Sequence, residues 1–140
     1  MDDGALVSLV ERSIRVMTYE VDFAGVVSNQ VYFRWLEDLR MDLLQSHLDM
    51  RELLKLNALP VLTHTEIDYK RPLRLLDEVK GRMWVEELDG PKWSLRGQFV
   101  KDGVVCADAR QWGLFVDPTK FTVVDAPPQL PRVKRTPQRP

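Results

Sequence analysis

The sequence predicts an α+β domain in which one antiparallel five-stranded sheet wraps around one long helix. Three observations predict it. Apolar residues recur with helical spacing in one long stretch, they alternate with polar residues in five others, and glycine, proline and aspartate separate these stretches. A chain of 140 residues, 44% of them apolar, is long enough to form one globular domain with a core of its own.

The first two elements are a strand and the long helix. Residues 10–19 alternate between two faces, which is typical of a strand. A loop that contains Gly25 follows. From about residue 29 to residue 48, apolar side chains recur at positions i, i+4, i+7 and i+11, which predicts a helix of about five turns; these side chains are Tyr32, Leu36, Leu39 and Leu43. A short helical segment is expected at residues 50–56.

Four further strands follow in succession. Period-two alternation covers residues 61–70, 79–86, 93–99 and 104–116. The sequences Asp89-Gly90-Pro91 and Asp102-Gly103 are turn signals that indicate antiparallel neighbours. After Asp117-Pro118 the chain becomes rich in proline and basic residues. We therefore expect a domain at residues 1–118 and an extended or disordered tail at 119–140.

Composition excludes several classes of function. Twenty Lys and Arg against 21 Asp and Glu leave no basic excess for nucleic-acid binding. The single cysteine, Cys106, forms no internal disulfide and excludes a Cys-based zinc site. No apolar run has the length of a membrane span, and the N-terminus is acidic where a signal peptide is basic. A cytoplasmic protein without metal or cofactor is expected.

The small size predicts a homo-oligomer. One helix cannot cover both faces of a five-stranded sheet, so the uncovered face and the edge strands are expected to meet other copies. We expect a dimer with shared active sites that assembles further into a tetramer.

The segment before the long helix carries the sharpest chemical signal. Glu20 and Asp22 precede Gly25, where the chain enters the helix. The free N–H groups and positive end of a helix start stabilise a carbonyl oxygen that develops negative charge. A carboxylate facing such a site is a hydrolytic arrangement. In the alternative interpretation, Asp22 and Asn29 only satisfy hydrogen bonds of the loop and the helix cap.

These residues resemble the signature of the hot-dog-fold acyl-CoA thioesterases of the 4-hydroxybenzoyl-CoA thioesterase superfamily. The pattern stands here as Glu20-x-Asp22-x-x-Gly25-Val26-Val27, followed in register by Tyr32, Trp35, Glu37 and Arg40. Pro60-Val61, Asp68-Tyr69-Lys70-Arg71-Pro72 and Asp77 also match, so the resemblance covers about residues 10–117. The segment 25–32 resembles the branch with plant plastid acyl-carrier-protein thioesterases and polyketide-associated thioesterases. The resemblance implies a hot-dog fold.

The resemblance also implies roles for single residues. Asp22 matches the catalytic carboxylate, as nucleophile on the thioester carbon or as general base for water. Backbone N–H groups at Asn29 and Gln30 match the oxyanion donors. Asn29 stands where many members have His or Tyr, which moves the expected substrate toward aliphatic or carrier-bound chains. Glu37 is a rival catalyst, because a second hot-dog class uses a helix-borne carboxylate; its alternative role is an ion pair with Arg34 or Arg40.

Further residues are candidates for substrate contact. Tyr32, Trp35 and His64 are expected in the acyl pocket, with core packing for the two aromatic residues and a wall position for the histidine as alternatives. Lys70 and Arg71 are candidate ligands of the phosphate groups of coenzyme A or phosphopantetheine, against the alternative of a solvated loop.

Together these features predict a thioesterase that hydrolyses an acyl-CoA or acyl-carrier-protein thioester to the free acid. A thiol with a pKa near 8.5 leaves readily as thiolate, so one carboxylate and an oxyanion hole are sufficient for the reaction. The alternatives are a non-catalytic acyl-binding protein and a hot-dog dehydratase. The dehydratase requires an Asp/His pair, and no histidine lies next to Asp22 in the sequence.

Overall fold

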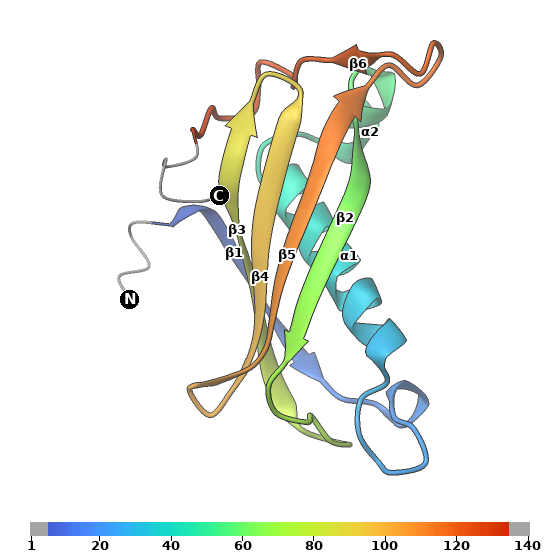
Figure 1. The fold of residues 1–140 in the computed structure, drawn as a ribbon, viewed down its shortest axis with the longest axis vertical. Helices are drawn as coiled ribbons and strands as arrows, with labels where there is room; N and C mark the ends of the chain where they lie inside the picture. Colours follow the sequence, from blue (N-terminus) through green and yellow to red (C-terminus); the bar gives the residue numbers. More distant parts are fainter. Residues whose placement is uncertain (1–5, 135–140) are drawn as a thin grey trace.

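The computed structural model describes residues 6–134 and shows the predicted sheet around one long helix. The five long strands are antiparallel and lie in the order β1-β3-β4-β5-β2. Helix α1 (Asn29–Gln45) runs across one face of this sheet (Figure 1). The strand bounds are β1 Val7–Arg15, β2 Leu59–Tyr69, β3 Glu78–Asp89, β4 Lys92–Lys101 and β5 Val104–Val116.

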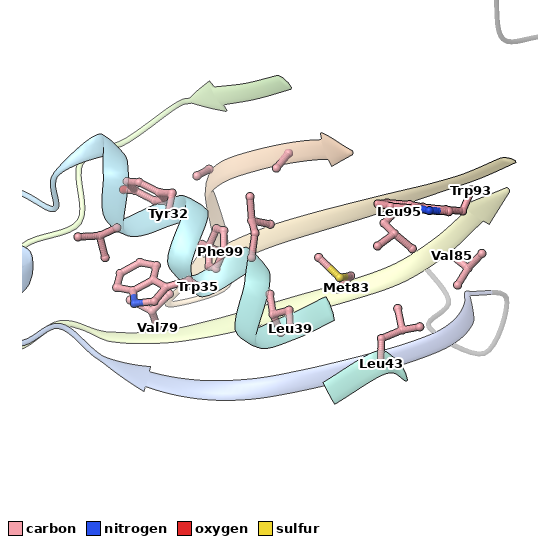
Figure 2. Close-up of a cluster of buried hydrophobic side chains, with 14 of the residues drawn as sticks. Tyr32, Trp35, Leu39, Leu43, Val79, Met83, Val85, Trp93, Leu95 and Phe99 are labelled. Carbon is pink, nitrogen blue, oxygen red and sulfur yellow. The ribbon is translucent and has the colours of Figure 1, made fainter. Parts of the chain in front are cut away.

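The core lies between α1 and the sheet. The helix buries one stripe of side chains at the predicted spacing: Val31, Tyr32, Trp35, Leu36, Leu39 and Leu43. Figure 2 shows this stripe facing Val79, Met83, Val85, Trp93, Leu95 and Phe99 of β3 and β4. In the figure Tyr32, Trp35 and Phe99 gather at one end of the core and Val85, Trp93 and Leu95 at the other. The two ends of the core therefore have different side chains, with three packed aromatic rings at one end.

A glycine in the middle of β4 sets how closely α1 approaches the sheet. A Cβ at Gly97 would come within 2.7 Å of Leu36 Cδ2, and Leu36 is completely buried. The helix therefore packs directly on the backbone of β4 at this position, which only glycine permits without displacement of a core side chain.

Several boundaries differ from the prediction, and two of these differences lie at the end of the first strand and at the end of the long helix. The first strand ends at Arg15, and residues Thr18–Glu20 form a 3₁₀ turn instead of continuing the strand. The cause is the Glu20 carboxylate, which accepts hydrogen bonds from the Met17 N–H at 2.9 Å and the Trp35 Nε1–H at 3.0 Å and so folds the chain back toward the helix. Helix α1 ends at Gln45, earlier than predicted, and the short helix α2 (Met50–Lys55) follows as expected.

A sixth, two-residue strand extends the sheet beyond the predicted five. Strand β6 (Val123–Val124) pairs with the end of β5. It belongs to residues 119–134, which we call the C-terminal strap and which run across one end of the sheet (Figure 1). The strap buries Ala126 and Leu130. The rest of the segment expected to be extended or disordered, residues 135–140, lies outside the described residues.

Strand β2 is one of the two edges of the sheet. It pairs only with β5, so the hydrogen-bonding groups along its other side have no strand partner among residues 6–134. Val61 and Leu62 on this strand are each 39% exposed. Unpaired edges with exposed apolar side chains are sites where another chain adds. Within the same residues, no helix combines the length and apolarity that a membrane span requires.

The close contact at Gly97 predicts the effect of adding one methyl group. Gly97→Ala forces Leu36 out of its packed position and is expected to lower the free energy of unfolding by about 1–3 kcal/mol, as overpacking of a core does. Urea unfolding measures the change. Gln98→Ala, on the opposite face of the same strand, is the matched control and is expected to change stability by no more than about 0.5 kcal/mol. Equal stability of both variants would contradict the close-packing argument.

Candidate functional site

The candidate site is built from two loops that hold each other at one end of the molecule. The loop at residues 16–28, which we call the β1–α1 loop, lies beside residues 70–77 between β2 and β3. Val27 N–H donates to the Leu73 carbonyl at 2.8 Å, and Leu76 N–H donates to the Val16 carbonyl at 2.9 Å. These backbone bonds fix the position of the entrance to α1.

Asp22 forms the tight turn of the β1–α1 loop. Its Oδ1 accepts hydrogen bonds from the N–H groups of Ala24 at 2.9 Å and Val26 at 3.4 Å. Gly25 closes the turn with a φ of 75°, a conformation that favours glycine. One carboxylate oxygen thus has the structural role considered in the alternative interpretation. The other oxygen, Oδ2, has no hydrogen-bond partner among the described residues, and the side chain is exposed.

The start of α1 offers two free donors. The N–H groups of Asn29 and Gln30 have no protein acceptor within residues 6–134, and the Ser28 side chain does not cap the helix. The first N–H groups of a helix carry its partial positive charge. This end of the helix is therefore ready to bind an oxygen atom that carries negative charge.

A surface pocket at this end of α1 brings four of the predicted residues together. We call it the helix-start pocket. Its walls include the predicted residues Asn29, Tyr32, Lys70 and Arg71, and the remaining walls are Val26, Val27, Tyr69 and Pro72. Asp22 does not line it, but its turn is bonded to Val26, which does. Neither Lys70 nor Arg71 forms an ion pair within the described part of the chain.

Tyr32 contributes a neutral phenol to the helix-start pocket. Burial, with smaller contributions from Cys106 and Tyr69, raises the pKa of Tyr32 to about 12. Its ring also packs edge-on against Trp35, Tyr69 and Phe99 at 5.2–5.6 Å between centroids. Tyr32 is therefore a rigid wall of the pocket that does not act as a base at neutral pH.

The other predicted residues lie elsewhere. Trp35 is buried in the core and holds Glu20. Gln30 is exposed and does not line the helix-start pocket. His64 is exposed on β2, where its Nε2 lies 3.3 Å from Glu66 Oε1. Glu37 is exposed on α1 and lies within ion-pair distance of neither Arg34 nor Arg40, but its charge raises the pKa of Arg40 against the larger lowering effect of burial. The structure thus separates these four side chains from the pocket that holds Asn29 and Tyr32.

A second cavity lies at the other end of α1, and we call it the strap cavity. It has a volume of about 120 Å³ and sits between the C-terminal half of the helix and the sheet. Its walls are mainly apolar: Leu43, Leu44, Pro60, Leu62, Val85, Leu88, Trp93, Leu95, Phe115, Leu130 and Pro131, with Arg40 and His47. Sequence reasoning missed it because these residues read as ordinary core positions. A sequence signal was the apolar side chains, Leu130 among them, of the proline-rich segment after residue 118.

Comparison with known proteins identifies relatives. The sequence profile of the thioesterase-like superfamily matches residues 16–133. A Synechocystis sp. protein that carries the name of an esterase is 28% identical over 118 residues, which cover 81% of this chain and 70% of that protein. A cluster of three or more potential metal-binding side chains is absent from the described residues.

Solved structures share the fold. A protein from Escherichia coli that is named a probable thioesterase superimposes with a TM-score of 0.74 at 25% identity, covering 81% of this chain and 87% of that one. A 1,4-dihydroxy-2-naphthoyl-CoA thioesterase from Synechocystis superimposes with a TM-score of 0.78 at 15% identity, covering 86% and 91% of the two chains. These similarities confirm the expected hot-dog fold.

The contacts of Glu20 predict that it anchors the β1–α1 loop. Glu20→Ala leaves the buried Trp35 Nε1–H and the Met17 N–H without an acceptor, so the free energy of unfolding is expected to fall by about 2–4 kcal/mol. Chemical unfolding followed by tryptophan fluorescence measures it. Glu20→Gln keeps one acceptor oxygen and should lose less. An exposed control, Glu11→Ala, removes only a surface ion pair of 3.8 Å and should change stability by less than about 1 kcal/mol.

Proposed function

Because the chain belongs to the thioesterase-like superfamily and is a thioester hydrolase, we propose that it releases a free carboxylic acid from an acyl-CoA or acyl-carrier-protein thioester. In this proposal Asp22 is the catalytic carboxylate. One observation carries the proposal. The free Oδ2 of Asp22 and the free N–H groups of Asn29 and Gln30 belong to one short, hydrogen-bonded loop and helix start beside an open pocket.

The proposed reaction uses the helix start to bind the thioester oxygen. The N–H groups of Asn29 and Gln30 stabilise the charge on this oxygen as the carbonyl carbon becomes tetrahedral. In one route Asp22 attacks that carbon, the carbon–sulfur bond breaks to give thiolate and a mixed anhydride, and water hydrolyses the anhydride to the free acid and regenerates Asp22. In the other route Asp22 removes a proton from a water that attacks the carbon, and the carbon–sulfur bond then breaks to give the free acid and thiolate. In both routes the thiolate leaves and takes up a proton. Because the thiol is acidic, the leaving group requires no protein acid.

The thiol carrier is proposed to be held by the cations of the helix-start pocket. Lys70 and Arg71 are exposed, form no ion pair among residues 6–134 and line the same pocket as Asn29. Coenzyme A and the phosphopantetheine arm of a carrier protein both bear phosphate oxygens, which ammonium and guanidinium groups bind by charge-assisted hydrogen bonds. This arrangement supports a carrier that reaches the thioester site along the loop between β2 and β3, where Lys70 and Arg71 lie.

A second copy of the chain is proposed to complete each site. The free edge of β2 with exposed Val61 and Leu62 supports antiparallel pairing with the same strand of a partner, and stacking of two such dimers would give a tetramer. Strand β2 begins at Leu59 near the strap cavity and ends at Tyr69 in the helix-start pocket. Two-fold antiparallel pairing would therefore place the strap cavity of one copy beside the helix-start pocket of the other.

Replacing Asp22 tests the catalytic assignment. In Asp22→Asn the amide oxygen still accepts the N–H bonds of Ala24 and Val26, so the turn is retained while the charge is lost. We expect kcat to fall by about 10²–10⁴-fold with little change in Tm, measured by thiol release from acyl-CoA. Asp49→Asn is the matched control, because Asp49 accepts from Arg51 N–H at 2.9 Å in the same local geometry at the start of α2.

Two results would contradict the assignment. Full turnover by a folded Asp22→Asn variant excludes Asp22 as the catalytic carboxylate. Loss of turnover in Glu37→Gln with normal activity in Asp22→Asn assigns the role to the rival Glu37. Wild-type protein that binds acyl-CoA without thiol release would instead identify a non-catalytic acyl-binding protein.

Charge reversal at the pocket tests carrier binding. Lys70→Glu together with Arg71→Glu replaces attraction to phosphate by repulsion, so KM for acyl-CoA is expected to rise by about tenfold or more while kcat changes little. Initial rates over a range of substrate concentrations measure it. Lys92→Glu reverses an exposed charge at the opposite end of the sheet and serves as control. An unchanged KM in the double variant would show that these cations do not hold the carrier.

A further inference from the structure

We propose that the C-terminal strap closes the acyl cavity of the enzyme and that Leu130 sets the length of acyl chain that is accepted. The inference rests on the proposed thioester hydrolysis and assigns the strap cavity as the place where the end of the acyl group lies. Leu130 and Pro131 are the two residues of the strap that line this cavity. Leu130 is 6% exposed, although it lies in a segment of mostly exposed residues.

The strap is fixed to the sheet by backbone hydrogen bonds on both sides of Leu130. On one side, Ala126 N–H donates to the Gly90 carbonyl at 2.9 Å. On the other, Leu88 and Val133 exchange two bonds of 2.7 and 3.0 Å. Leu88 itself lines the strap cavity, so the second attachment lies directly at the cavity wall.

An arginine clamp holds the turn that presents Leu130. The Arg132 guanidinium donates to the carbonyl of Ala126 at 3.0 Å through Nη2 and to that of Leu130 at 3.2 Å through Nη1. Leu130 N–H in turn donates to the Pro127 carbonyl at 3.1 Å. A single side chain thus ties both ends of the turn, and Leu130 is held in place as a fixed wall.

The chemistry of the cavity favours an apolar acyl end. Leu88, Trp93 and Phe115 line the same cavity as Leu130. The two polar residues of the lining already have partners: Arg40 Nη1 donates to Gln111 Oε1 at 2.7 Å, and His47 Nε2 lies 2.8 Å from Ser8 Oγ. Burial of a methylene group in such a cavity is favourable by about 0.8 kcal/mol. The expected occupant is the alkyl end of an aliphatic acyl chain.

The position of the cavity agrees with the proposed dimer. Asn29 and Leu43 are 14 positions apart on α1, which corresponds to about 21 Å of helix. The strap cavity of one chain therefore lies far from the helix start of the same chain. Antiparallel pairing of two β2 strands would bring it beside the helix start of the partner, so the thioester and the acyl end would be held by different copies.

Replacing Leu130 by a smaller and by a larger side chain in the full chain tests the inference. Hydrolysis of a series of saturated acyl-CoA substrates from butyryl to palmitoyl is measured as kcat/KM for each variant. Leu130→Ala lengthens the cavity and is expected to shift the optimum to longer chains, raising the long-to-short ratio by about tenfold. Leu130→Trp shortens it and is expected to shift the optimum to shorter chains. Because each ratio is taken within one variant, loss of folded protein does not alter it.

Two control variants distinguish the effect of Leu130 as a cavity wall from the effect of any substitution in the strap. Phe121→Ala changes an 80% exposed residue of the same strap outside the cavity and should leave the chain-length profile as in the wild type. Arg132→Gln removes the clamp and should broaden the profile. Unchanged profiles in both Leu130 variants would overturn the inference while leaving thioester hydrolysis intact. Absence of hydrolysis of every substrate by the wild type would instead contradict the proposed function.

Discussion

The contact between α1 and one face of the sheet is the interaction on which the rest of the structure depends. The helix buries one continuous stripe of side chains, and Gly97 lets Leu36 rest on the backbone of β4. Burial of this apolar area is the main stabilisation available to a single sheet with one long helix. It also fixes the direction of the helix, and with it the positions of the helix-start pocket and the strap cavity.

At the start of the helix, packing and chemistry depend on the same residues. Trp35 is part of the buried stripe, and its indole N–H holds the Glu20 carboxylate. Glu20 in turn ends β1 and shapes the loop that carries Asp22. The core therefore positions the β1–α1 loop through the buried hydrogen bond between Trp35 and Glu20. Within residues 6–134 the side chain of Asp22, the next carboxylate along the chain, accepts hydrogen bonds through Oδ1 only. At the other end, where Leu43 and Leu44 leave a gap above the sheet, residues from the strap complete the wall.

Local sequence patterns were sufficient for most of the fold. Alternation gave the five long strands, helical spacing gave α1, and Asp102-Gly103 gave a hairpin, because each pattern reflects a periodicity of the backbone itself. The prediction failed where a long-range contact overrides local preference. Residues 16–19 alternate like a strand, but the bond between Glu20 and Trp35 turns the chain there. Strand β6 depends on pairing with a strand end that no local pattern reveals.

By itself, the sequence determined the fold class, the family resemblance and the segment in which two carboxylates, Glu20 and Asp22, precede the helix, since these reside in spacing along the chain. Only the tertiary structure decided which candidates share a pocket. The start of α1 meets the end of β2, so Asn29 and Tyr32 line the same pocket as Lys70 and Arg71. His64 and Glu37 lie exposed elsewhere. It also decided that Leu130, in a segment rich in proline and charge, is a wall of the strap cavity. Such neighbours are far apart in sequence, and only packing in three dimensions brings them together.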